Sequence, residues 1–124
     1  AAVPIDAISS FVTFLENTRG YRQDLRRAEY GDERDPAMRK VFEQIAPIRM
    51  SDRMKKPMMV FQGANDPRVP RTESEQMVEK LRAQGTEVWY VLAKDEGHGI
   101  YKKANQEAVR TVEVQFLKKV LGVE

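Results

Sequence analysis

The sequence predicts an α/β fold in which helices cover a parallel sheet. Two segments rich in apolar and β-branched residues, 58–61 and 88–92, are each followed by a loop and then by a helical pattern. A strand, loop, helix order that occurs twice is typical of a parallel sheet with helices on its faces. The chain has 124 residues, of which 41% are hydrophobic and 32% charged. These values suit one globular domain.

The N-terminal residues predict a short strand and a short helix. Residues 1–5 are apolar and could end a buried strand, although Pro4 interrupts it. Ser9 or Ser10 is placed to cap a helix that carries a cluster of apolar residues. That helix is expected to end in the region 17–20.

Two further helices are expected before the strand over 58–61. The charged segment 21–30 predicts a surface helix, and Gly31 is a plausible end for it. Asp35 can cap the next helix while Pro36 occupies its first turn, where the missing amide does no harm. The residue before Pro47 should end this helix.

The strand over 58–61 is apolar enough to be buried on both faces of the sheet. The turn-rich loop 62–70 follows it. Thr72 and Glu75 predict a capping box at the start of the next helix, which continues to Gly85.

The C-terminal third begins with the strand 88–92 and a loop over 95–100 that contains two glycines. The last helix is expected from about Asn105. Lysines near its C-terminus suit the helix dipole. Its predicted inward-facing residues are Val109, Val112, Phe116, Leu117 and Val120.

The candidate catalytic residues are Asp66, in the loop after the strand 58–61, and His98, in the loop after the strand 88–92. Loops that follow neighbouring parallel strands converge on one edge of the sheet. We therefore expect Asp66 and His98 to meet, although 32 positions separate them. A carboxylate beside an imidazole orients the ring and stabilises its protonated form, so that the other ring nitrogen can act as a general base.

Each of these residues also has a purely structural interpretation. Asp66 could shape a turn through its own backbone, and a lone histidine between glycines often serves the fold alone. Their placement at consecutive strand ends favours chemistry. Arg68 is expected to form a structural ion pair with Asp95 or Glu96.

The loop stretches also carry a resemblance. The first contains Gly63-Ala64-Asn65-Asp66-Pro67-Arg68-Val69-Pro70, the second contains Glu96-Gly97-His98-Gly99, and Glu73-Ser74-Glu75-Gln76-Met77-Val78 lies between them. In this order they resemble the C-terminal part of the prolyl oligopeptidase family of serine peptidases. The segment 21–39 resembles the dipeptidyl and acylaminoacyl peptidase branch of that family.

The resemblance implies a C-terminal portion of an α/β-hydrolase fold, with three parallel strands flanked by helices. Residues 1–124 would form a single partial domain. The family uses a Ser, Asp, His triad, in which Asp66 matches the aspartate and His98 the histidine. Ile100 stands where family members often have Phe.

The triad nucleophile is not found in this sequence. No two of the seven glycines are four positions apart, so the Gly-x-Ser-x-Gly turn of such hydrolases does not occur. The first residue is Ala1, which suggests a start inside a longer polypeptide. We therefore expect a C-terminal piece of a serine peptidase for short peptides, of dipeptidyl or acylaminoacyl type. It would supply Asp66 and His98 and be inactive alone.

Two alternatives remain open. The same triad serves esters, so the chain could belong to a carboxylesterase-type hydrolase. It could also be a noncatalytic interaction module that keeps Asp66 and His98 for packing. The triad chemistry requires no metal or organic cofactor, and the single histidine excludes multi-histidine metal sites.

The expected partners follow from the incomplete sheet and from the charge pattern. They are a peptide substrate, the missing N-terminal part of the protein, and a second copy that pairs at an exposed strand edge. Basic and acidic residues are interleaved, which argues against nucleic acid. The longest apolar run, 88–93, is too short to cross a membrane. The absence of cysteine fits any compartment, and a cytoplasmic location is only slightly favoured.

Overall fold

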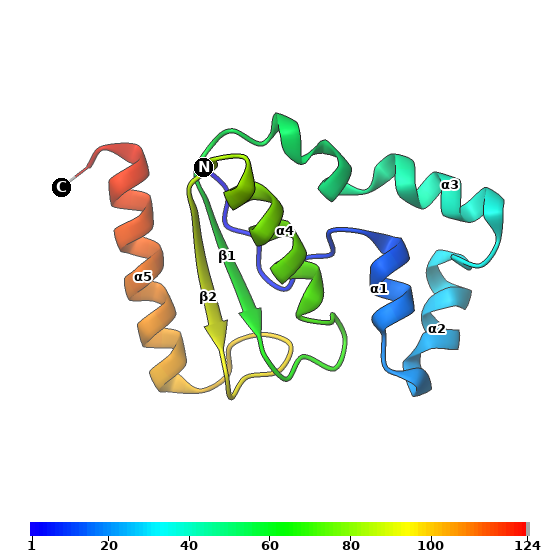
Figure 1. Cartoon of the computed structure of the whole chain (residues 1–124). Helices are drawn as coiled ribbons and strands as arrows, with labels where there is room; N and C mark the ends of the chain where they lie inside the picture. The colour runs from blue at the N-terminus through cyan, green and yellow to red at the C-terminus, as the bar shows by residue number, and fades with distance from the viewer. Residues whose placement is uncertain (124) are drawn as a thin grey trace.

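The computed structural model describes residues 1–123, and its helices and strands form two lobes (Figure 1). The elements in chain order are α1 (Phe11–Asn17), α2 (Gly20–Tyr30), α3 (Pro36–Ile45), the 3₁₀ helix η1 (Pro47–Arg53), β1 (Met58–Gly63), α4 (Thr72–Ala83), β2 (Val88–Ala93) and α5 (Lys103–Leu121). Helices α1–α3 make up a three-helix lobe, and the strands with α4 and α5 make up a sheet lobe. Among the helices of the described residues, none combines the length and apolar character that a bilayer crossing requires.

The sheet consists of β1 and β2 in parallel, with a third segment alongside β1. The register of the two strands runs from Met58 opposite Val88 to Gly63 opposite Ala93. Residues 2–5 run parallel to β1 and pair with it through isolated bridges, Ala2 to Met58 and Ile5 to Phe61. The expected first strand is therefore in place, but it is not a continuous strand.

Pro4 explains why that first segment is irregular. The amide of Ala2 donates to the carbonyl of Pro57 at 3.2 Å, and the amide of Phe61 donates to the carbonyl of Pro4 at 3.0 Å. Pro4 has no amide hydrogen to continue the ladder toward Met59. The chain then turns at Asp6, whose φ of 45° lies in the left-handed region.

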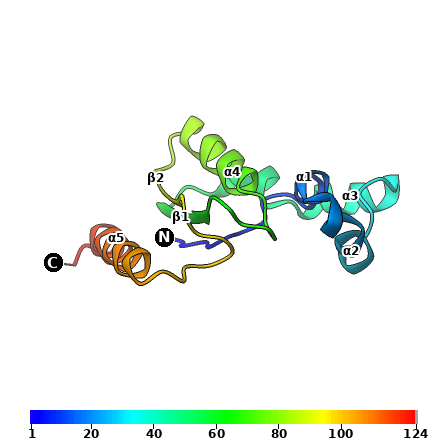
Figure 2. The same cartoon turned by 90° about the horizontal axis from the view of Figure 1, so that it is seen from below.

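Helices cover both faces of the sheet, as Figure 2 shows from below. On one face, Val60 of β1 packs with Val78 and Leu81 of α4. On the other face, Phe61 packs with Phe116 of α5. The prediction that β1 is buried on both faces is confirmed.

The three-helix lobe has its own apolar cluster. The rings of Phe11 in α1 and Phe42 in α3 stack with their centroids 5.4 Å apart. Val69, from the loop after β1, packs into the same cluster and so connects that loop to the lobe. Helix α2 buries no residue, which confirms the predicted surface helix. The predicted start of α3 is also confirmed, because the Asp35 carboxylate accepts the Ala37 amide at 2.8 Å.

The predicted capping box of α4 is wrong. Arg71 occupies the N-cap position without a side-chain hydrogen bond, and the amide of Glu73 donates to the carbonyl of Pro70 at 3.0 Å. Ser10 does occupy the N-cap position of α1, but its hydroxyl caps nothing. Instead, buried Glu73 accepts the amide of Ser10 at 2.9 Å, so a residue of α4 fixes the start of α1.

Candidate active site

The loops after β1 and β2 touch through their backbones. The amide of Asn65 donates to the carbonyl of Glu96 at 2.9 Å. A Cβ atom on Gly63 would lie only 1.9 Å from the carbonyl oxygen of Gly97, so this contact exists only because residue 63 has no side chain. The ends of the two strands therefore form one edge with the loops that follow them. We name the segment 64–70 the acid loop and the segment 94–102 the base loop.

Asp66 is held by its own loop. Its side chain is fully buried, and Oδ1 accepts the amides of Arg68 at 2.7 Å and of Val69 at 3.0 Å. This is the turn-forming role that the sequence analysis considered. The second oxygen, Oδ2, is left to face the base loop. One carboxylate therefore shapes the turn and also serves the site.

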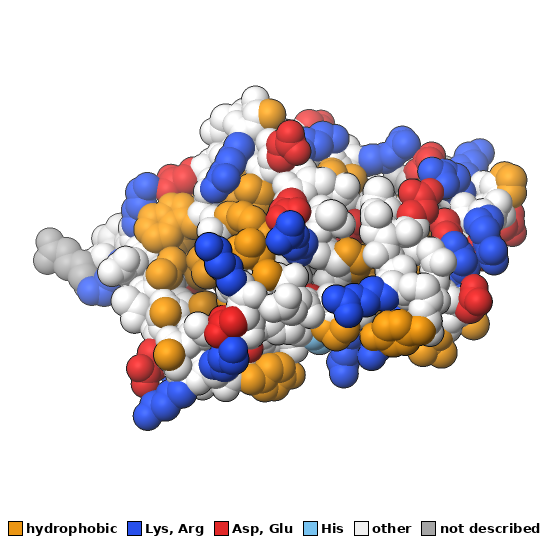
Figure 3. Space-filling model, turned by 60° about the horizontal axis from the view of Figure 1, so that its bottom comes forward, with side chains coloured by type: hydrophobic (Ala, Val, Ile, Leu, Met, Phe, Trp, Pro, Cys, Tyr) orange, Lys and Arg blue, Asp and Glu red, His pale blue; other side chains and the backbone are white. Residues whose placement is uncertain are grey.

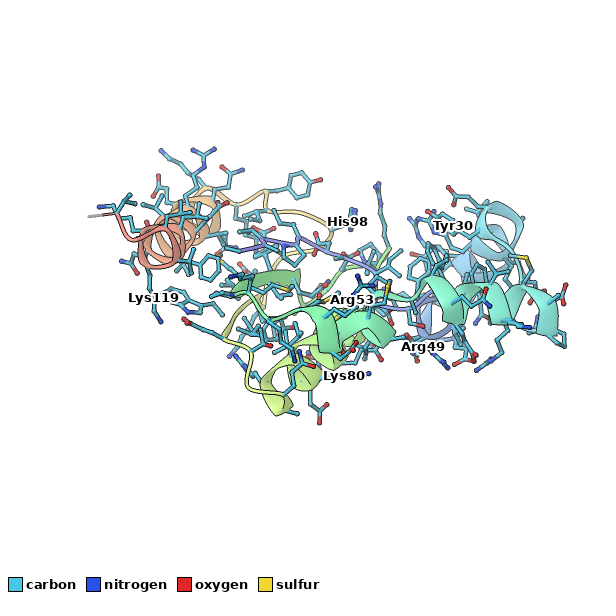
Figure 4. The ribbon with its side chains drawn as sticks, turned by 90° about the horizontal axis from the view of Figure 1, so that it is seen from above. Tyr30, Arg49, Arg53, Lys80, His98 and Lys119 are labelled. Carbon is cyan, nitrogen blue, oxygen red and sulfur yellow. The ribbon has the colours of Figure 1, made fainter. Side chains whose placement is uncertain are left out.

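His98 points its Nδ1 at that second oxygen. The distance from Nδ1 to Oδ2 of Asp66 is 2.8 Å, so the structure brings the two candidate residues together. The His98 side chain is 35% exposed, and Nε2 has no hydrogen-bond partner among residues 1–123. Figure 4 places His98 between α5 and the three-helix lobe, and Figure 3 shows part of the imidazole at the surface.

Asp6 is a third member of the site that the sequence analysis missed. Its side chain is 4% exposed, and Oδ2 lies 3.9 Å from Nδ1 of His98. Burial raises the pKa of Asp6 and the charge of Asp66 raises it further, while the amides of Gly63 and Gly99 and the His98 ring oppose the shift. Its position at the carboxyl end of the first predicted strand was the available signal, because such ends converge with those of the neighbouring strands.

Arg68 does not form the predicted ion pair. Its side chain is exposed, and both expected acceptors bind other groups. Asp95 accepts from the Lys102 ammonium at 2.6 Å, and Glu96 accepts the Lys102 amide at 2.8 Å. These bonds attach the base loop to the start of α5. They occupy the two carboxylates with which Arg68 was expected to pair.

The donor set does not favour a metal. Asp6, Asp66 and His98 offer ligand atoms within 4.8 Å of one another. However, three of their four carboxylate oxygens accept backbone amides, and the fourth faces Nδ1 of His98. All four carboxylate oxygens are therefore already engaged by groups of the described residues.

The parallel sheet with helices on both faces is a partial α/β-hydrolase fold, and the loops after its two strands bring Asp66 and His98 together. Over residues 1–124 the chain matches the Prolyl oligopeptidase family, peptidase S9, and it belongs to this family.

Two curated relatives are dipeptidyl peptidases by name. The chain is 42% identical over 92 residues to dipeptidyl aminopeptidase BIII of Pseudoxanthomonas mexicana, which covers 74% of this chain and 13% of that protein. It is 39% identical over 105 residues to dipeptidyl peptidase family member 6 of Caenorhabditis elegans, covering 85% of this chain and 14% of that protein. The chain thus spans about a seventh of the length of these relatives.

Solved structures agree on the fold. A puromycin-hydrolyzing peptidase of Mycobacterium tuberculosis superposes on 99% of this chain, with 19% of its own length, a TM-score of 0.86 and 27% identity. An acylaminoacyl peptidase of Pyrococcus horikoshii superposes on 96% of this chain and 20% of its own, with a TM-score of 0.84 and 17% identity. The expected α/β-hydrolase fold is confirmed.

Proposed function

We propose that this chain supplies the acid and base of a serine peptidase that acts on short peptides, of dipeptidyl or acylaminoacyl type. The observation that carries the proposal is the 2.8 Å contact between Nδ1 of His98 and buried Asp66. The names of the relatives favour peptide substrates over esters. The partner supplied by the rest of the polypeptide would be the nucleophilic serine.

In this mechanism Asp66 keeps the proton on Nδ1 of His98, which leaves Nε2 as the base. Nε2 takes the serine proton as the serine oxygen attacks the amide carbonyl, and later gives it to the leaving amine. Asp66 stabilises the imidazolium that forms between these steps. No step needs a metal or an organic cofactor.

The serines of this chain support the proposal that the nucleophile lies elsewhere. All four, Ser9, Ser10, Ser51 and Ser74, are buried. The Ser9 hydroxyl donates to the carbonyl of Glu73 at 2.8 Å, and that of Ser74 donates to Gln62 at 2.8 Å. We therefore propose that the 124-residue chain is inactive alone.

The decisive experiment uses the polypeptide encoded by the complete reading frame. We expect it to hydrolyse dipeptidyl and N-acyl-aminoacyl anilides, and His98→Ala to lower kcat about 10⁴-fold or more, because the base is lost. Arg110→Ala, which changes an exposed side chain of α5, is the control and should leave kcat unchanged. Turnover of anilides by the 124-residue chain, if lost on His98→Ala, would refute the proposed division of the triad. Activity on p-nitrophenyl esters without activity on anilides would favour the esterase alternative.

We further propose that the free edge of residues 2–5 pairs with the missing part of the protein or with a second copy. Ile5 is 53% exposed at this edge. An adjacent apolar cavity of about 170 Å³ is lined in part by Pro4, Ile8 and Met58. Unpaired apolar edges invite further strands. Sedimentation should show reversible association of the 124-residue chain as its concentration rises, and a monomer at every concentration would contradict self-pairing.

A further inference from the structure

Asp6 is a buried carboxylate that the proposed triad does not use. Its two oxygens accept two amides from different parts of the site: Oδ1 accepts that of Gly63 at 3.3 Å, and Oδ2 accepts that of Gly99 at 2.9 Å. Gly63 ends β1, and Gly99 directly follows His98. The side chain therefore ties the base loop to the central strand.

The backbone at Asp6 is shaped for this contact. The pairing of residues 2–5 with β1 ends with the Asp6 amide, which donates to the carbonyl of Phe61 at 3.1 Å. The chain then turns away at φ 45°, which aspartate and asparagine tolerate better than most residues. In a continued ladder the Gly63 amide would bind the Asp6 carbonyl, and here the carboxylate takes its place.

Asp6 also places a second negative charge near the His98 ring. Its Oδ2 is 3.9 Å from Nδ1, compared with 2.8 Å for Oδ2 of Asp66. Both carboxylates favour a proton on Nδ1, because a proton there faces two negative charges. Proton on Nδ1 is the state that leaves Nε2 free as a base.

We propose that Asp6 is a positioning residue for His98. The Asp6 carboxylate holds the base loop against β1 and supports the form of the His98 ring that carries its proton on Nδ1, beside Asp66. Its catalytic meaning rests on the proposed function. The geometry can be tested without turnover, so failure of this inference and failure of the proposed function are distinguishable. Because His98 is the only histidine, its ring gives an unambiguous NMR signal.

Asp6→Asn is the informative variant. Asparagine tolerates the left-handed backbone conformation, but its side chain has only one acceptor oxygen. The amides of Gly63 and Gly99 each bind a separate oxygen of Asp6, so one of them loses its acceptor. In the 124-residue chain we expect the Gly63 or the Gly99 amide to exchange with solvent about tenfold faster. We also expect the Nδ1-bound proton of His98 to exchange about fivefold faster, since the ring loses one of two facing carboxylates. Asp52→Asn, at an exposed carboxylate of η1 outside the base loop, is the control and should change neither signal.

The His98 proton separates positioning from a purely structural role. If Asp6→Asn accelerates the glycine amides but leaves the Nδ1 proton within about twofold of wild type, Asp6 only ties the loop and the proposal is overturned. Unprotected Gly63 and Gly99 amides in the wild-type chain would overturn it as well. In the complete polypeptide, Asp6→Asn should lower kcat about tenfold and leave KM unchanged.

A second measurement needs no substitution, which matters if Asp6→Asn does not fold. Protonation of Asp6 in the wild-type chain removes the same charge, and burial raises the pKa of this group above 3.8. The groups that face it are Asp66, His98 and the amides of Gly63 and Gly99. The chemical shifts of the Gly99 amide and of the His98 ring should change with the same midpoint as the chemical shift of the Asp6 carboxyl carbon. A His98 ring insensitive to that midpoint would overturn the proposal.

Discussion

The acid loop and the base loop of this site are held in place in different ways. Asp66 fixes its own loop, because one of its oxygens accepts the amides of the second and third residues that follow it. The base loop is not held by His98 itself but by the carboxylates of two other residues. Asp6, at the far end of the chain, accepts the amide of Gly99, and Glu96 accepts that of Lys102.

This difference separates what is local from what is assembled by the fold. Asp66 is positioned by a turn whose hydrogen bonds lie entirely within residues 66–69. The base is positioned by a hydrogen bond between residues 93 positions apart, which exists only once the sheet has formed. Substitutions in the two loops should therefore have unequal effects.

Gly63→Ala should have the largest effect, because it strikes where the two loops meet. The new Cβ would lie 1.9 Å from the backbone oxygen of Gly97, and a backbone atom cannot move aside as a flexible side chain can. We expect a loss of about 3 kcal/mol or more in the free energy of unfolding, measured by urea denaturation. Gly20→Ala is the control, since a Cβ there meets nothing within 4 Å. Equal stability of the Gly63→Ala and wild-type chains would contradict the close contact of the loops.

The same distinction explains what could be predicted from the sequence. The order of strands and helices along the chain, the burial of β1 and the Asp35 cap depend on local patterns, and the structure agrees with them. Asp66 and His98 could be selected because each follows a recognisable strand.

The wrong capping box and the contacts that were missed have different causes. The capping box of Thr72 and Glu75 failed for a local reason, because Arg71 occupies the N-cap position of α4. The contact of Glu73 with the Ser9 and Ser10 amides was missed because these residues lie 64 and 63 positions from it. Asp6 was missed because its partners, Gly63 and Gly99, are brought near only by the parallel sheet. Local propensity carries no information about such contacts.

Glu96→Ala should have an intermediate effect that is confined to the base loop. Loss of its carboxylate leaves the Lys102 amide without its acceptor, so we expect that amide to exchange about tenfold faster. Asn65→Ala is the counterpart in the acid loop, where an exposed side chain donates to the carbonyl of Lys94 at 2.9 Å. It should change the exchange of neighbouring amides less than Glu96→Ala does. An equal response of both loops would remove the proposed difference between them.

The charge of Glu96 gives this prediction a pH dependence. Hydrogen bonds from Asn105 and from the Lys102 amide hold the pKa of Glu96 below its usual 4.5. Its ionised form is therefore bound more favourably in the folded chain, and that stability is present above pH 4.5 and lost as the pH falls through the lowered pKa. The stability difference between wild type and Glu96→Gln should accordingly shrink on acidification. A difference that stays constant between neutral pH and pH 3 would contradict it.

Arg68→Ala should have the smallest effect, and it tests whether the acid loop is held by backbone alone. Asp66 binds the amide of residue 68, which every residue except proline provides, while the Arg68 side chain is exposed. We expect the free energy of unfolding to change by less than about 0.5 kcal/mol. Arg68→Pro removes that amide and should destabilise the chain by about 1–3 kcal/mol, since a buried carboxylate oxygen loses one donor. If Arg68→Ala proved as damaging as Arg68→Pro, the side chain would hold the acid loop, and the self-contained turn at Asp66 would be refuted.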